Sequence, residues 1–97
     1  MARVMWRARA RLDVERLYDF LWQKAPEAAT RAAQFILEGA TLLETSPRLG
    51  RPLQDGTGRR ELFLSFGASD YVLRYLLVDE ETVLILRVWH SREKRKS

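Results

Sequence analysis

The chain has 97 residues, 46% of them apolar, which is the size and composition of one ordinary globular domain spanning residues 1–97. It has no cysteine and one histidine, which excludes disulfides, thiolate chemistry and a zinc site of His and Cys ligands. Lys and Arg outnumber Asp and Glu by 17 to 13, a net charge of +4. No apolar run approaches the ~20 residues of a membrane span and the first residues lack a secretory apolar region, so we expect a cytoplasmic protein that contacts no membrane.

The positive charges are unevenly distributed along the chain. They gather near the start (Arg3, Arg7, Arg9, Arg11), around the centre (Arg48, Arg51, Arg59, Arg60) and at the end (Arg92, Lys94, Arg95, Lys96). Such clusters indicate an acidic partner, either nucleic acid or an acidic protein. The alternative is that arginine only keeps a small surface soluble, so direct binding of nucleic acid stays open.

The first predicted elements are a short strand and a helix. Residues 3–6 alternate, with Val4 and Trp6 on one side, as in an edge strand. From about Ala8 the period becomes that of a helix. One apolar face of this helix is formed by Val14, Leu17, Tyr18 and Leu21. We place Asp13 and its charged neighbours on the other faces.

A second helix follows almost at once, over about residues 26–44. Pro26 ends the first helix, because the residue before a proline is pushed out of the α region. It also fits the first position of the next helix, where its missing N–H costs nothing. The second helix carries many small residues, which let two helices approach closely: Ala28, Ala29, Ala32, Ala33, Gly39 and Ala40. The pair is therefore predicted to form an antiparallel αα-hairpin.

After the helices come a loop and a strand. Residues 47–58 hold three of the five glycines and two of the three prolines, which predicts a loop. A loop of this length in a small domain tends to be functional. Residues 59–65 are predicted to be a strand with Leu62 and Leu64 on one side, and residues 66–70 a turn.

Two apolar runs, residues 71–78 and 83–90, predict a β-hairpin of buried strands. Each run carries one charge, Arg74 or Arg87, which is costly inside a buried strand unless it is paired or reaches a functional cleft. A four-residue turn would place the two arginines opposite each other, where they would need a shared acceptor. A three-residue turn would place them on opposite faces, and the sequence leaves the register open. In either case each arginine could instead pair with a carboxylate on a packed helix.

The element order is therefore β-α-α-β-β-β. It predicts a two-layer α+β fold, in which the N-terminal αα-hairpin packs on a mostly antiparallel four-stranded sheet.

Four residues on or just beyond the last two strands could bind and cleave a phosphodiester: Arg74, Arg87, His90 and Arg92. Acid–base catalysis needs a general base and a general acid, and this set offers one histidine. A lone histidine at a strand end is also often structural. The sequence thus shows a basic sheet face without a complete active site, and we expect no cofactor and no metal.

Several short motifs, specific in their order and spacing, carry a family resemblance: residues 13–21, 26–29, 46–52, 58–62, 71–75 and 85–90. Together they make residues 6–93 resemble toxins of the RelE/ParE superfamily from bacterial type II toxin–antitoxin modules. The resemblance implies the same β-α-α-β-β-β fold.

The superfamily divides by target. Its ribosome-dependent mRNA nucleases typically carry an arginine after the aromatic that opens the third strand, where this chain has Val72, and a catalytic group such as tyrosine in the tail. Residues 91–97 hold no aromatic. The helical hairpin and the Leu-Gly-Arg-Pro loop look more like the ParE branch. The resemblance therefore implies a non-enzymatic poison of DNA gyrase. The alternative, a ribosome-dependent mRNA endoribonuclease using Arg74, Arg87, His90 and Arg92, stays open.

The resemblance also implies a cognate acidic, ParD-like antitoxin that docks an amphipathic helix in an apolar groove, with a strand added at a sheet edge. Predicted antitoxin-binding residues are Leu17, Leu21, Phe35 and Leu42. Predicted target-binding residues are Arg87, His90, Arg92, Lys94 and Arg95.

Overall fold

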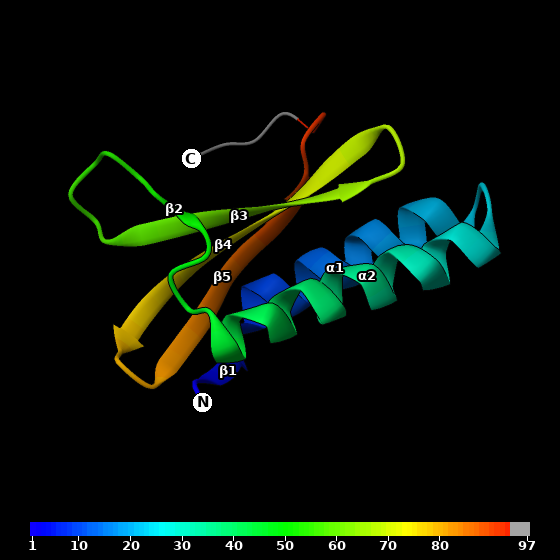
Figure 1. Cartoon of the computed structure of the whole chain (residues 1–97). Helices are drawn as coiled ribbons and strands as arrows, with labels where there is room; N and C mark the ends of the chain where they lie inside the picture. The colour runs from blue at the N-terminus through cyan, green and yellow to red at the C-terminus, as the bar shows by residue number, and fades with distance from the viewer. Residues whose placement is uncertain (94–97) are drawn as a thin grey trace.

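Two helices cover one face of a five-stranded sheet in the computed structural model (Figure 1), which describes residues 1–93 apart from the side chain of Ser69. The elements are β1 (Arg3–Trp6), α1 (Ala8–Trp22), α2 (Pro26–Thr45), β2 (Arg51–Pro52), β3 (Arg59–Phe66), β4 (Ser69–Asp79) and β5 (Thr82–His90). The strand order is β1-β5-β4-β3-β2, with β1 parallel to β5 and the other neighbours antiparallel. No helix in the described part of the chain is both long and apolar enough to cross a membrane.

The predicted α+β order is confirmed, but the sheet has five strands where four were predicted. The additional strand, β2, lies in the segment predicted to be loop, and pairs Arg51 with Glu61 and Pro52 with Arg60. A two-residue strand at an edge has no periodicity of its own, so only its pairing with β3 reveals it. Proline is tolerated there because an edge strand can leave one side of its main chain unpaired.

The helical hairpin packs on the sheet through small residues. Pro26 takes the first position of α2, as predicted, and Ala29, Ala32 and Ala40 are buried. Gly39 is required by close approach, since a Cβ there would overlap the side chain of Leu64 on β3. This brings α2 directly onto the sheet.

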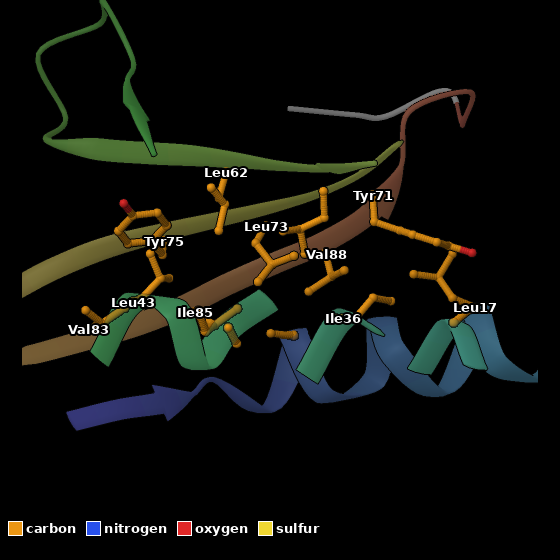
Figure 2. Close-up of a cluster of buried hydrophobic side chains, with 14 of the residues drawn as sticks. Leu17, Ile36, Leu43, Leu62, Tyr71, Leu73, Tyr75, Val83, Ile85 and Val88 are labelled. Carbon is orange, nitrogen blue, oxygen red and sulfur yellow. The ribbon is translucent and has the colours of Figure 1, made fainter. Parts of the chain in front are cut away.

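The core lies between the helices and the sheet (Figure 2). Leu17, Ile36 and Leu43 of the helices meet side chains of the three central strands, including Leu62, Leu73, Ile85 and Val88. Each fully buried aliphatic or aromatic side chain contributes about 1.5–3 kcal/mol. Tyr71 and Tyr75 of β4 point to the same side, which places the inner face of β4 at residues 71, 73 and 75.

The β4–β5 hairpin combines both registers that the sequence left open. Arg74 lies opposite Arg87, as a four-residue turn requires. Tyr75 lies opposite Ile85, as a three-residue turn requires, because the register shifts between Arg74 and Tyr75 and again between Leu77 and Asp79. Such irregularities insert one extra residue and redirect side chains locally.

The loop before β3 is anchored by Tyr75. Its hydroxyl donates to the carbonyl of Pro47 and accepts from the N–H of Gly50, both at 2.8 Å. Arg60 adds a guanidinium hydrogen bond of 2.7 Å to the carbonyl of Gly50. Burial raises the pKa of Tyr75, so the hydroxyl keeps the proton that it donates.

Gly50→Ala is expected to lower the free energy of unfolding by about 1–3 kcal/mol, the usual cost of overpacking. The added Cβ would lie 2.7 Å from Tyr75 Cε1 and 2.9 Å from the Glu61 carbonyl oxygen. Urea denaturation would measure the loss. Gln54→Ala, an exposed change in the same loop, should stay within about 0.5 kcal/mol of wild type. Equal stabilities for the two variants would contradict the tight packing at Gly50.

Candidate functional site

Asp13 on α1 joins the helix to β5. Its Oδ2 accepts hydrogen bonds of 2.8 Å from both Arg87 Nε and the Val88 N–H, and its Oδ1 accepts one of 3.2 Å from an Arg87 Nη. The carboxylate is buried, with Asp13 only 4% exposed. The prediction that Asp13 lies on a helix face other than the apolar one is therefore wrong, because it is buried in line with Leu17. The available signal was its spacing of four residues from Leu17, which places both on one helix stripe.

Asp13 and Arg16 together close the edge of β5 where β1 no longer covers it. β1 pairs with β5 only as far as Trp6 opposite Ile85. Beyond that point, Asp13 accepts from the Val88 N–H, and Arg16 donates to the Val88 carbonyl at 3.4 Å. An open edge is a site where another strand can add, and here two side chains of α1 occupy it. The hydrogen bond to Asp13 also raises the pKa of Arg87, which therefore stays charged.

Arg74 is neutralised separately, by Glu61 on β3. Its Nε and Nη2 donate to Glu61 Oε2 at 2.9 and 2.6 Å. The guanidinium also lies 5.1 Å from the ring centre of Trp89, within cation–π range. The alternative that each arginine pairs with a carboxylate on a packed helix is thus confirmed for Arg87 and wrong for Arg74. The helix supplies the partner only for Arg87, because Glu61 lies directly opposite Arg74 in the β3–β4 register.

A cavity of about 520 Å³ lies between α1 and the ends of β4 and β5, and is called the α1 cavity below. Its lining residues are Arg16, Leu17, Phe20, Leu21, Tyr71, His90, Arg92 and Glu93. Leu17, Phe20 and Leu21 lie at i, i+3 and i+4 on one face of α1 and form the apolar wall of the cavity. The end of β5 and the turn after it form the polar rim. This volume falls within the range of small-ligand sites and accommodates a large side chain of a partner.

The polar rim of the α1 cavity is held by hydrogen bonds. Glu93 Oε1 accepts from the His90 N–H at 2.7 Å, and Oε2 pairs with Arg16. The Arg92 N–H donates to His90 Nδ1 at 3.1 Å, and the imidazole packs edge-on against Tyr71 with ring centres 5.3 Å apart. Burial, followed by the charge of Glu93, raises the pKa of the Tyr71 hydroxyl. The turn after β5 is thereby tied to α1.

Of the four residues considered for phosphodiester chemistry, two line the α1 cavity and two do not. His90 and Arg92 reach the α1 cavity, whereas Arg74 and Arg87 lie in separate ion pairs with Glu61 and Asp13 and line no part of it. Among the predicted target-binding residues, Lys94 and Arg95 lie outside the described residues.

Of the four predicted antitoxin-binding residues, two line the α1 cavity and two do not. Leu17 and Leu21 line the α1 cavity. Phe35 packs on Phe66 with ring centres 5.1 Å apart, and Leu42 is exposed on α2 away from the cavity lining. Four further lining residues were not among the predicted site residues: Arg16, Phe20, Tyr71 and Glu93. Phe20 carried a signal, since it follows Leu17 by three residues and Arg16 by four.

Residues 4–95 match the profile of a family described as ParE toxin of type II toxin-antitoxin system, parDE. The chain is similar to Toxin RelE3 of Caulobacter vibrioides, with 44% identity over 87 residues that cover 90% of this chain and 91% of the relative. It is also similar to Toxin RelE1 of the same organism, with 35% identity over 92 residues that cover 95% and 96% of the two chains.

A solved structure described as the chromosomal ParDE TA system from P. aeruginosa has the same fold. One of its chains superposes with a TM-score of 0.73 at 24% identity, covering 93% of this chain and 96% of that chain.

Proposed function

The chain belongs to the ParE toxin family of type II toxin–antitoxin systems, within the RelE/ParE superfamily, and from this premise we propose that it stops growth in the cytoplasm by poisoning DNA gyrase. A cognate acidic antitoxin neutralises it. The α1 cavity receives an apolar side chain from an amphipathic helix of that antitoxin, since Leu17, Phe20, Leu21 and Tyr71 provide the apolar walls that such a helix needs.

The ion pairing of Arg74 and Arg87 is the observation that favours a protein target over RNA cleavage. An arginine that stabilises phosphoryl charge must present its donors to the substrate. Here Nε and an Nη of each guanidinium are held by Glu61 or Asp13. His90 Nδ1 accepts from the main-chain N–H of Arg92, so this nitrogen is already engaged within the chain.

The second candidate, ribosome-dependent mRNA cleavage, is favoured by one arrangement. His90, Arg92 and Arg16 lie around one cavity, and imidazole and guanidinium groups suit that chemistry. The similar Caulobacter toxins also bear the name RelE and not ParE.

Purified protein is expected to inhibit supercoiling by DNA gyrase and to accumulate cleaved DNA, while mRNA from expressing cells stays intact by primer extension. Adding the antitoxin encoded beside it should restore supercoiling. Cleavage of mRNA within codons that is lost in His90→Gln, with gyrase unaffected, would establish the second candidate instead. Leu12→Gln, an exposed change on α1 outside the cavity lining, is the matched control.

A further inference from the structure

The basic cluster at the centre of the chain lies on and beside β2, at the opposite edge of the sheet from β1 (Figure 1). Arg48 and Arg51 are exposed, and Leu49 between them is 51% exposed. Phe63 of β3 is 45% exposed, and the Arg51 guanidinium lies 5.3 Å from the centre of its ring. These four residues are called the β2 face below. None of them lines the α1 cavity, so the β2 face is a separate surface.

The two arginines of the β2 face are not neutralised within residues 1–93. Neither Arg48 nor Arg51 has an ion pair there. Two carboxylates of this part of the chain already have cationic partners. Asp55 pairs with Arg59 at 3.0 Å, and Glu61, which lies opposite Arg51 in the register, pairs with an arginine of β4 at 2.6 Å. The β2 face is therefore positively charged and suits an anionic ligand.

The loop that carries Arg48 is held in place through its main chain. The hydroxyl of Tyr75, a fully buried residue, joins the Pro47 carbonyl to the Gly50 N–H. Arg60 donates to the carbonyl of Arg48 at 3.2 Å and to that of Gly50 at 2.7 Å. These contacts use main-chain groups, so they leave the side chains of the loop available to a ligand. A loop that is already ordered loses less conformational entropy on binding.

The outer edge of β2 offers no N–H to a partner strand. The Leu53 N–H donates inward to the Arg59 carbonyl at 2.8 Å. Because main-chain groups alternate along a strand, Pro52 is the residue of β2 that faces outward, and proline has no N–H. A ligand at this edge is therefore recognised through side chains.

We propose that the β2 face binds a DNA strand, through phosphate contacts to Arg48 and Arg51 and stacking of a base against Phe63. Guanidinium groups pair with phosphate oxygens, and exposed aromatic rings stack the bases of single strands. The inference rests on the proposed function for the source of the strand, which is the DNA that gyrase has cleaved. A base at a break can leave the helical stack, whereas each base of the resealed duplex is stacked on both sides. Binding the free base would therefore favour the cleaved state.

Two protein occupants fit the β2 face less well. An acidic segment that adds a strand would need an outward N–H, which Pro52 lacks. A second copy of this chain, related by two-fold symmetry, would bring the arginines of the two β2 faces together, and like charges repel.

The test of the phosphate contacts is fluorescence anisotropy with a labelled single-stranded DNA oligonucleotide and the full chain. Replacing Arg48 and Arg51 by glutamine together is expected to weaken binding at least tenfold. It should also reduce the slope of log affinity against log salt by about 1.4, the value for two phosphate contacts to a single strand. The matched control replaces Arg9 and Arg31, exposed on the two helices, by glutamine and should stay within twofold of wild type.

The test of stacking is Phe63→Leu, which keeps an apolar side chain but removes the ring. It is expected to bind the single strand at least fivefold more weakly, the lower end of the effect of losing one stacked base. Leu12→Ala, which changes an exposed leucine of α1, is the control and should bind as wild type does. Duplex DNA of the same sequence should bind wild type at least fivefold more weakly than the single strand. If Phe63→Leu fails to fold by thermal melt, cross-linking of a bromouracil-containing strand to wild type should give an adduct within residues 59–66.

The outcomes separate this inference from the proposed function. If the double glutamine variant binds DNA as its control does, or Phe63→Leu binds as wild type does, the inference is overturned even though gyrase is inhibited. Single-stranded RNA of the same sequence that binds at least tenfold more tightly than DNA would also overturn it. If the β2 face variants lose DNA binding as expected but wild type leaves gyrase unaffected, the DNA site stands and the proposed function falls.

Discussion

Arg87→Ala is expected to lower the free energy of unfolding by about 3 kcal/mol, the lower end of the cost of breaking a buried ion pair. Asp13 would remain buried with its charge and keep only the Val88 N–H at 2.8 Å and Arg16 at 3.5 Å. The side chain of Arg87 is 35% exposed, so its own loss of solvation on pairing is partial, which places the estimate at the low end. Urea denaturation with an unchanged m-value would measure the loss.

A double-mutant cycle identifies the cause of that loss. Asp13→Ala alone leaves Arg87 free to reach water but leaves the Val88 N–H without its acceptor. With Asp13 absent, removing Arg87 should cost much less, which gives a coupling free energy of at least about 1 kcal/mol. Arg31→Ala, exposed on α2, is the control and should change stability by less than about 0.5 kcal/mol. Additive effects of the two substitutions would show that the pair does not join α1 to β5 energetically.

Ending the chain after Glu93 is expected to abolish growth inhibition while leaving folding and antitoxin binding intact. The deletion removes Lys94, Arg95 and Lys96, three cations suited to an acidic or DNA-bound target. It retains Glu93, whose carboxylate holds His90 and Arg16 at the rim of the α1 cavity. Induced expression measures growth, and a thermal melt and antitoxin binding measure the rest.

Two related chains show which property of the tail matters. Replacing Lys94, Arg95 and Lys96 by glutamine keeps the length and should abolish toxicity equally if charge is responsible. Ending the chain after Ser91 also removes Glu93 and its two contacts. We expect this shorter chain to lose about 1 kcal/mol of stability in addition, the typical net contribution of such hydrogen bonds. A glutamine variant that still stops growth would place the target surface elsewhere, such as the loop over residues 47–58.

The sequence by itself determined the layering and the elements other than β2. The helix predicted over residues 26–44 is observed as Pro26–Thr45, and the strand predicted over residues 59–65 as Arg59–Phe66. These bounds follow from local causes: proline geometry at Pro26, a 3.6-residue period in the helices, and alternation in β3. Once two amphipathic helices and an apolar hairpin exist, burial of their apolar faces leaves few arrangements besides helices on one face of a sheet. The need of Arg74 and Arg87 for carboxylates was also readable, because a buried charge requires a partner.

Only the tertiary structure decided which partners meet. Asp13 and Val88 are 75 residues apart, and no local pattern specifies that one carboxylate serves both Arg87 and the edge of β5. The hairpin register depends on two irregularities that local propensity does not encode. The rim of the α1 cavity is completed by the ion pair between Glu93, in the turn after β5, and Arg16 on α1. Such sites depend on distances between segments remote in the chain, which packing of the whole core sets and periodicity does not.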